Sequence, residues 1–311
     1  MKTLYLDCQA GISGDMTVAA LLDLGVPLEH LQRELAKLAL PDSSYSLSAA
    51  RTERHHITAL KFDVTVNDHH THRQYAAIDA MIAASGLTDG VKEKAQRIFR
   101  RLAEAEAKVH GVPVEEVHFH EVGAVDSIVD IVGTAICLDY LSVARVCASA
   151  LPLGSGFVAT EHGRLPVPAP ATAELLRGLP VHGECGPGER VTPTGAAIIA
   201  ALADGFGFPP MRIEKTGCGA GGKDFPDMPN ILRAFIGPVD AVTEVSQLLV
   251  LEANIDDSTP EVLGYALERL LTEGALDAWF TPIQMKKGRP AVTLSLLCPS
   301  GEVEKFSRII L

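Results

Sequence analysis

The stretch KTLYLDCQAGISGDMTVAALLDL, residues 2–24, decides the fold class of this 311-residue chain. Residues 2–6 form an apolar run of strand length, residues 7–14 include two glycines and predict a loop, and residues 15–24 predict a helix. A buried strand that leads through a short loop into a helix is typical of α/β proteins. We therefore expect an α/β fold, in the wide sense that includes α+β.

The loop between this strand and helix is a candidate binding site. Free backbone N–H groups at a strand-to-helix turn can hold a phosphate, but the lysine that a P-loop needs after Gly14 is replaced by Asp15. Two carboxylates in one loop favour a divalent ion or a cationic ligand, and a plain helix cap explains Ser13 and Asp15 equally well. The candidate substrate contacts in this loop are Asp7, Cys8, Ser13 and Asp15.

Outward from this unit, the hydrophobic pattern predicts two strands in residues 43–67, the second with apolar residues at alternate positions. Helices are predicted at residues 74–84, 91–110, 122–141, 171–177 and 194–203. The glycine-rich run of residues 217–222 is predicted to be a loop, because glycines break regular elements. A linker-like stretch at residues 237–246 then separates a second unit.

The second unit is predicted to be small and to mix helices with strands. Its pattern gives a strand, a helix, two strands and the start of a helix, at residues 248–253, 260–271, 276–283, 292–297 and from 302. A β-α-β-β-α order suggests a ferredoxin-like (split βαβ) domain without its last strand. Because the chain stops at Leu311 inside a predicted helix, we expect this domain to be truncated. We divide the chain into a large N-terminal α/β domain, residues 1–240, and a small ferredoxin-like C-terminal domain, residues 246–311.

The composition argues against several classes of protein. The chain is 47% hydrophobic and 21% charged with a net charge of −12, so it can bury a core and lacks the basic clusters that bind nucleic acid. Charges interrupt every long apolar stretch, so we expect no membrane span. Six scattered cysteines without a CxxC pair, in a chain without a predicted secretory signal, favour free thiols and a cytoplasmic protein.

Histidines form two candidate metal-binding tracts. The first puts His69, His70 and His72 just after a predicted strand, where a solvated surface loop is an equally good interpretation. In the second tract, His118 and His120 are two residues apart on an extended segment, so both point to one side and can share an ion. Imidazole is a common ligand of Zn, Cu, Fe and Ni.

Carboxylates at the start of the helix predicted at residues 122–141 extend the second tract. Glu121 precedes the helix, and Asp126 and Asp130 lie one turn apart within it. The helix is otherwise small and apolar, and carboxylates in such a setting need a partner or a metal. Helix capping by Glu121 and Asp–Arg pairs are the structural alternatives. We rank the metal interpretation first, because five polar residues meet at one helix start.

Two further segments carry candidate substrate contacts. Prolines in residues 161–170 fix the backbone around His162 and Arg164, although a proline-rich surface crossing is the alternative. The glycine run lets a ligand approach the backbone, with Cys218 as a candidate soft donor. A plain turn with a buried cysteine is the alternative there.

Charged residues of the second unit suggest a nucleotide site. Asp256 and Asp257 follow its first strand, and grouped oxygen donors of this kind suit Mg or Mn. Lys286, Lys287 and Arg289 form the densest cationic cluster of the chain and predict contacts to a triphosphate. A hairpin with a basic turn is the alternative.

Taken together, these segments resemble the nickel-insertion protein of nickel-pincer cofactor biosynthesis. The resemblance covers the whole chain in order. Its most specific strings are DCQAGISGDM (residues 7–16), HFHEVGAVDSIVD (118–130), PVPAP (166–170), TPTGA (192–196), NIDD (254–257) and MKKGRP (285–290). The first histidine tract, the pair His162-Gly163 and the glycine run through Asn230 match as well.

The resemblance implies a metallochelatase. The family inserts nickel into pyridinium-3,5-bisthiocarboxylic acid mononucleotide, forming a metal–carbon bond and metal–sulfur bonds, in a CTP-dependent step that also needs Mg or Mn. Nickel and the pyridinium substrate are then expected in the N-terminal domain, and CTP with its divalent ion in the C-terminal domain. Homo-oligomers, and apo lactate racemase as acceptor of the cofactor, are further expectations. A base must accept the pyridinium ring proton, and His118, His120 and His162 are the candidates.

Two other functions remain open. A metal-dependent phosphohydrolase could use the same histidines and aspartates on a nucleotide, and turnover of simple phosphate esters without nickel would favour it. A non-catalytic nickel storage or delivery protein needs only the histidine tracts, and stoichiometric nickel binding without CTP turnover would favour it.

Overall fold

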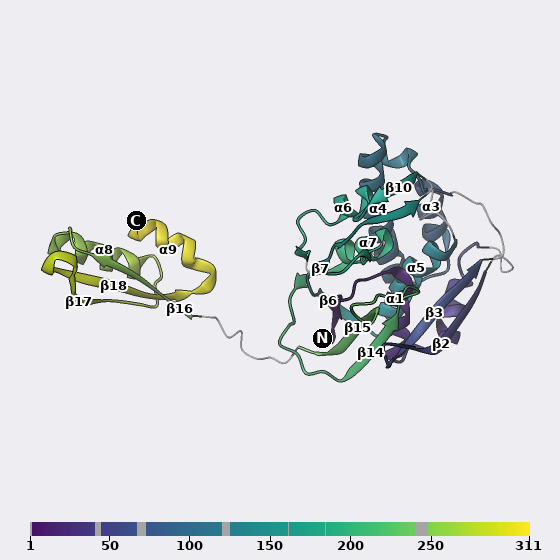
Figure 1. The fold of residues 1–311 in the computed structure, drawn as a ribbon, viewed down its shortest axis with the longest axis horizontal. Helices are drawn as coiled ribbons and strands as arrows, with labels where there is room; N and C mark the ends of the chain where they lie inside the picture. The colour runs from purple at the N-terminus through teal and green to yellow at the C-terminus, as the bar shows by residue number, and fades with distance from the viewer. Residues whose placement is uncertain are drawn as a thin grey trace. The chain divides into compact units, whose positions relative to one another are not determined.

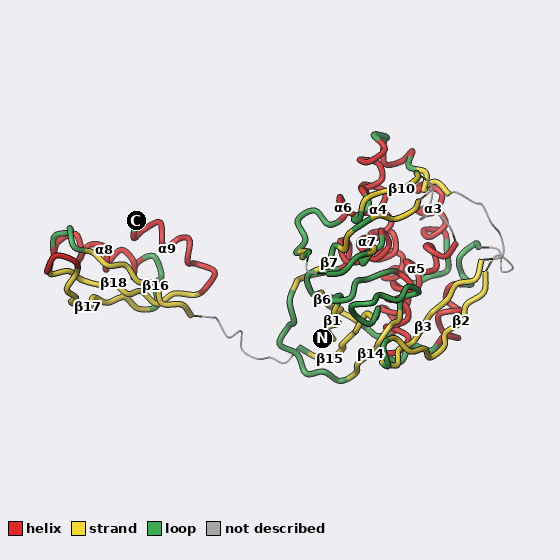
Figure 2. The backbone as a smooth tube through the Cα atoms, in the orientation of Figure 1, coloured by secondary structure: helices red, strands yellow, loops and turns green. Residues whose placement is uncertain are grey.

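The computed structural model of the chain describes residues 2–40, 45–66, 73–119, 125–160, 162–183, 185–239 and 248–311. The chain divides into two compact units, Met1–Asp240 and Ala241–Leu311. Both units combine helices with strands (Figures 1 and 2), and the predicted α/β fold class is confirmed. In the part of the chain that the structure describes, no helix is long and apolar enough to cross a membrane.

A mixed sheet forms the centre of the first unit. The residues of β1 (Lys2–Asp7) are buried from Thr3 onwards, because the strand lies inside the sheet. It pairs in parallel with β6 (Val143–Ala148) and antiparallel with β15 (Ile231–Pro238). The sheet continues through β14 (Lys215–Ala220), β3 (Ile57–Val66) and β2 (Tyr45–Arg54) on one side and β13 (Gly205–Phe206) on the other, in the order β13-β6-β1-β15-β14-β3-β2.

Helices pack on this sheet and on one another (Figure 1). The first helix, α1 (Gly14–Asp23), lies against β14 and β3 and also against α5 (Val125–Tyr140). The long α4 (Asp89–His110) packs against α5 and α7 (Pro193–Leu202). Their apolar side chains form one core with β1, in which Ile128 and Phe99 have no exposed surface. Further helices of this unit are α2 (Leu28–Leu35), α3 (Tyr75–Ala84), α6 (Pro170–Leu175) and the 3-10 turn Val114–Glu116.

Short ribbons lie beside the main sheet and carry several predicted site residues. They are β4 (Arg73–Gln74) with β5 (His118–Phe119), β9 (Phe157–Thr160) with β10 (Gly163–Pro166), β7 (Leu151–Pro152) with β11 (Val181–His182), and β8 (Gly154–Ser155) with β12 (Gly188–Glu189). The prolines of residues 166–170 lie at the end of β10 and directly after it.

The glycine run is part of the sheet, and its prediction as a loop is wrong for residues 217–220. These residues belong to β14, which pairs with β15 along its whole length. A Cβ atom at Gly217 would lie 2.4 Å from the carbonyl oxygen of Ala20, and one at Gly219 would lie 2.0 Å from that of Met16. The glycines therefore allow α1 to pack directly on the strand, and close packing rather than chain reversal explains the run.

The second unit has the predicted order of elements. It consists of β16 (Leu248–Ile255), α8 (Pro260–Thr272), β17 (Asp277–Met285), β18 (Arg289–Pro299) and α9 (Val303–Ile310). The strands form an antiparallel sheet with β18 between β16 and β17. Its small core contains Leu270, Leu294, Leu296 and Phe306. A central third strand is the arrangement that a β-α-β-β-α chain adopts in a split βαβ fold.

Candidate functional site

An acidic cleft of about 290 Å³ lies where three helices begin. The first residues of α1 and α5 and those flanking the start of α7 line it, together with part of β3. It brings together four predicted site residues from two distant segments: Ser13, Asp15, Asp126 and Asp130. Helix N-termini carry partial positive charge, so three of them at one cleft favour anionic groups there.

Backbone hydrogen bonds hold two of these helix starts side by side. The N–H of Ile12 donates to the carbonyl of Arg190 (2.9 Å), and the N–H of Thr192 donates to the carbonyl of Ile12 (3.1 Å). A Cβ atom at Gly195 would lie 2.3 Å from the same Ile12 oxygen, so only glycine allows α7 to start this close. The GISGD and TPTGA strings thus form one structural unit.

Asp130 is the most unusual group of the cleft. Its Oδ1 atom is buried and has no hydrogen-bond partner within the described residues. Burial, followed by the nearby Asp15 and Asp126 carboxylates, raises its pKa well above the usual range. A Cβ atom at Gly14 would lie 2.5 Å from Oδ2 of Asp130, so the glycine makes room for this carboxyl group. No Asp–Arg pair is seen for Asp130 in the described part of the chain.

The rim of the cleft includes a cation that the sequence analysis missed. Lys61 on β3 forms ion pairs with Asp15 (3.1 Å) and Asp63 (2.7 Å). Asp15 also accepts a hydrogen bond from the Ser13 hydroxyl, and the exposed Asp126 accepts one from the Ser127 N–H (2.8 Å). Lys61 lies at a regular polar position in the alternation of its strand, between Leu60 and Phe62, so the local sequence does not mark it as a site residue.

A second hollow of about 190 Å³ adjoins this cleft and shares Ser13, Asp15 and Thr192 with it. Its opposite wall includes Arg190, whose side chain has no exposed surface and stacks 3.6 Å above the ring of Phe225. The guanidinium forms an ion pair with Asp227 (2.7 Å). Nothing in the local sequence marks this arginine, because its partners lie more than 30 residues away.

Two other predicted substrate contacts line a different pocket, of about 320 Å³. Asp7 there pairs with Arg233, whose Nε donates to Oδ2 at 2.9 Å. Cys218 is half-buried, and burial followed by the nearby Asp23 raises the pKa of its thiol. Cys8 is instead a core residue with no exposed surface, and its thiol is not accessible to a ligand.

Most of the predicted histidine cluster lies outside the described residues: His69, His70, His72, His120 and Glu121. His118 is exposed on β5, with its Nε2 atom 3.0 Å from Nε2 of Gln74. In this ribbon Arg73 on β4 pairs with Phe119 on β5, and Gln74 pairs with His118. Within the described residues, no group of three His, Cys, Asp or Glu side chains is placed to hold a metal ion.

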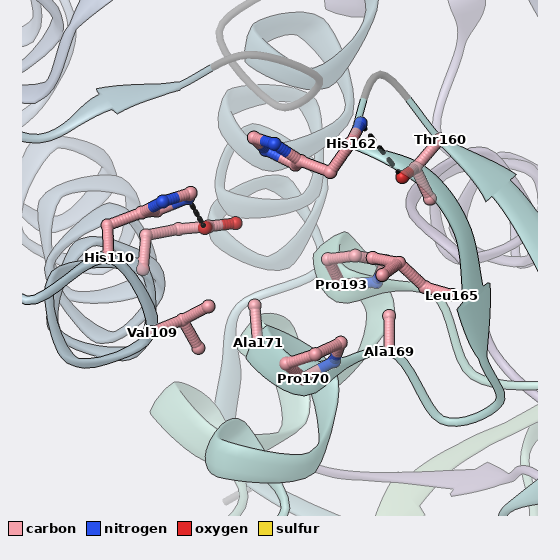
Figure 3. A pocket seen from close by; sticks show the side chains of 10 residues that line it. Val109, His110, Thr160, His162, Leu165, Ala169, Pro170, Ala171 and Pro193 are labelled. Atoms are coloured by element: carbon pink, nitrogen blue, oxygen red, sulfur yellow. Dashed lines mark hydrogen bonds and ion pairs between the residues drawn. The ribbon is translucent and has the colours of Figure 1, made fainter.

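His162 lies apart from the acidic cleft, at a pocket of about 150 Å³ (Figure 3). Its ring centroid is 5.1 Å from that of His110, which the sequence analysis did not single out. His110 pairs with Glu106 one turn earlier on α4 (3.3 Å). The exposed Arg164 stacks on Phe157, with its guanidinium carbon 4.4 Å from the ring centroid.

In the second unit, the structure brings two predicted nucleotide contacts together. Nη1 of Arg289 lies 3.1 Å from Oδ2 of Asp256. Lys286 and Lys287 precede this arginine in a 3-10 turn, in which Lys287 has a φ of 62°. Asp257 is exposed at the end of β16. Cationic and anionic groups therefore share one end of this sheet.

A comparison with protein families decides the assignment. The sequence model of the nickel insertion protein family matches residues 4–311. The chain belongs to this family. The nickel-inserting character that the sequence resemblance implied is therefore confirmed at the level of the family, and the match covers both units.

Proteins similar to this chain occur in several bacteria. A protein of Pelobacter propionicus, provisionally named a nickel insertion protein, is 68% identical over 99% of this chain and 79% of its own length. One from Geobacter sulfurreducens with the same provisional name is 62% identical over the whole chain and 80% of its own length. A third, from Dictyoglomus thermophilum, is 47% identical over the whole chain and 80% of its own length.

One solved structure is similar to a small part of the chain. It is the apo form of LarC2, described as the C-terminal domain of a cyclometallase involved in the synthesis of the NPN cofactor of lactate racemase. The similarity covers 20% of this chain and 44% of that one, at 49% sequence identity and a TM-score of 0.20.

Proposed function

We propose that this nickel insertion protein inserts nickel into pyridinium-3,5-bisthiocarboxylic acid mononucleotide in a CTP-dependent reaction. The product is the nickel-pincer cofactor, which lactate racemase then receives. The match to the nickel insertion protein family over residues 4–311 carries this proposal. The convergence of Ser13, Asp15, Asp126 and Asp130 on one cleft supports it, because these residues lie in the strings on which the resemblance rests.

The cleft suits a substrate that carries both anionic and cationic groups. Three helix N-termini and Lys61 favour the phosphate and thiocarboxylate groups of the mononucleotide. The aspartates favour the pyridinium ring or the incoming nickel. Carboxylates and imidazoles hold Ni(II) less strongly than thiolates do, so the ion can leave them for the softer sulfurs of the substrate.

The chemistry replaces a ring C–H bond by a nickel–carbon bond, and the proton of that bond must go to a base. His118, His120 and His162 are the proposed acceptors. The metal-binding role is proposed for both histidine tracts with Glu121, Asp126 and Asp130. Nickel is the cargo of this reaction, and the residues that hold it need to bind it only until the sulfurs of the substrate take it.

The second unit is proposed to bind CTP with Mg or Mn. Asp256 and Asp257 would hold the divalent ion, and Lys286, Lys287 and Arg289 would contact the triphosphate. The ion pair between Arg289 and Asp256 supports a common site, because both groups are already adjacent. Assembly into homo-oligomers and a place in the cytoplasm belong to the same proposal.

Assembly of the cofactor in vitro tests the proposed function. The purified chain is mixed with nickel, CTP, Mg or Mn and the dithiocarboxylate mononucleotide, and activation of apo lactate racemase is measured. We expect activation that requires each component, and its loss in Asp126→Asn. Phosphate ester turnover without nickel would instead indicate a phosphohydrolase. Nickel binding without CTP turnover or activation would indicate a storage or delivery protein.

A further inference from the structure

The pocket of Figure 3 combines two imidazoles with apolar walls. His110 is the last residue of α4, and His162 follows β9 in the ribbon of β9 and β10. Their rings point toward each other from opposite sides of the pocket, with centroids 5.1 Å apart. Glu106 and Thr160 also line the pocket. The rest of the wall consists of apolar side chains: Val109, Leu165, Ala169, Pro170, Ala171 and Pro193.

The spacing of the two rings fits a shared metal ion. With metal–nitrogen bonds of about 2.0–2.1 Å and angles between them of about 90–110°, two coordinated imidazoles have centroids about 4.5–5.2 Å apart. The observed 5.1 Å lies in this range, so the spacing of the rings is compatible with one shared ion. Two protein ligands leave other coordination positions to water or to a substrate, which suits an ion that must be passed on.

The charges around the pocket favour a cation. The carboxylate of Glu106 lies 3.3 Å from Nε2 of His110 and can fix the orientation of this ring. His110 also ends a 22-residue helix, whose C-terminal turn carries partial negative charge. The nearby Lys108 is engaged by Glu174 (2.7 Å), outside the residues that line the pocket.

The elements that carry the two histidines are held in place. The helix α4 packs against both α6 and α7, whose first residues Pro170 and Pro193 form the pocket wall. The N–H of His162 donates to the hydroxyl of Thr160 (3.1 Å), and this hydroxyl donates to the carbonyl of Gly163 (2.9 Å). The backbone on both sides of the pocket is therefore preorganised.

We propose that His110 and His162 form a binding site for a divalent late transition metal ion, nickel in this protein, with Glu106 as the residue that positions His110. In this role His162 is a ligand of the ion, which leaves His118 and His120 as the acceptors of the ring proton. The choice of nickel rests on the proposed function. Imidazole binds nickel well, and most of the side chains that line this pocket are apolar. The site is separate from the histidine tracts of residues 69–72 and 118–120.

Equilibrium dialysis of the full chain against Ni(II), with elemental analysis, tests the site. We expect His110→Ala and His162→Ala each to lose one nickel equivalent, or to bind it at least about 100-fold more weakly, with an unchanged circular dichroism spectrum. Glu106→Gln should weaken the same equivalent about 10-fold. The matched control is His56→Ala, because His56 also pairs with a glutamate (Glu53, 2.9 Å) but is 98% exposed, and the neighbouring His55 is engaged with the carbonyl of Phe225 (2.8 Å).

Nickel binding equal to wild type in both His110→Ala and His162→Ala overturns the proposal, as does an equal loss in His56→Ala. Should one variant fail to fold, the other decides.

A second measurement separates nickel bound at this site from nickel bound by the other histidines. In a background with alanine at positions 69, 70, 72, 118 and 120, one equivalent should remain and should disappear on adding His162→Ala. If the wild type assembles the cofactor and both the His110 and the His162 variants keep their nickel, this site is refuted but the proposed function is not.

Discussion

At the scale of the residue, Asp130 is the group whose two interpretations differ most. As a structural carboxylate it would stabilise the fold, and its replacement by asparagine would destabilise it. The structure instead shows a buried oxygen without a partner within the described residues, and a pKa raised by burial and by neighbouring carboxylates. Ionised Asp130 therefore destabilises the fold, which is a common property of functional sites.

We expect Asp130→Asn to have an equal or higher Tm than wild type at pH 8 and to lose nickel insertion. The sign follows from the raised pKa. The destabilisation is present above the raised pKa, is relieved as the pH falls through it, and is absent below the unfolded-state pKa of about 4. The difference in Tm between variant and wild type should therefore shrink from pH 8 to pH 4. A lower Tm at pH 8 with full insertion activity would contradict the functional interpretation.

At the scale of the element, Arg190 joins two segments around the glycine-rich strand. Its buried guanidinium stacks on Phe225 and pairs with Asp227, so the segment before α7 is tied to the loop between β14 and β15. Arg190 beside Asp227 lowers the pKa of this carboxyl group. Removing one partner of such a pair leaves a buried charge without compensation.

We expect Asp227→Asn to lower the Tm by several degrees at pH 7. A lowered pKa means that the stabilisation is present above the unfolded-state pKa and is lost as the pH falls through the folded-state value. The difference from wild type should therefore shrink below about pH 4. Asp224→Asn is the matched control, because Asp224 pairs with Arg54 (3.1 Å) but is 71% exposed. Equal effects of the two variants at pH 7 would contradict this role of Arg190.

At the scale of the whole molecule, the two units are proposed to hold different ligands. Nickel and the pyridinium substrate belong to the first unit in this proposal, and CTP with its divalent ion to the second. Each unit has its own core, so a substitution at an exposed residue of one unit need not affect ligand binding by the other.

We expect Arg289→Ala to raise the Kd for CTP about tenfold, since it removes a charged contact to the triphosphate, and to leave the nickel content unchanged. Calorimetry and the protection of the second unit by CTP from proteolysis measure the effect. Arg308→Ala is the control, because this arginine of the same unit makes only an exposed pair with Glu304 in the described structure. Equal protection of wild type and Arg289→Ala would reject the assignment.

The sequence by itself determined the fold class, the order of elements in the second unit and the family. These depend on local patterns: the apolar strand and helix of residues 2–24, the period of the long helices, and strings such as HFHEVGAVDSIVD. It also singled out Ser13 and Asp15, which lie in a glycine-containing loop before a helix, and Asp126 and Asp130, which are carboxylates in an otherwise apolar helix.

Only the tertiary structure decided which of these residues meet and which other groups join them. Lys61, Arg190 and His110 contact groups far away in the sequence, and nothing local to them indicates those contacts. The glycines at 217 and 219 wrongly indicate a loop for the same reason. Their conformation is that of an ordinary strand, and the need for glycine arises from the carbonyl groups of α1 packed against them.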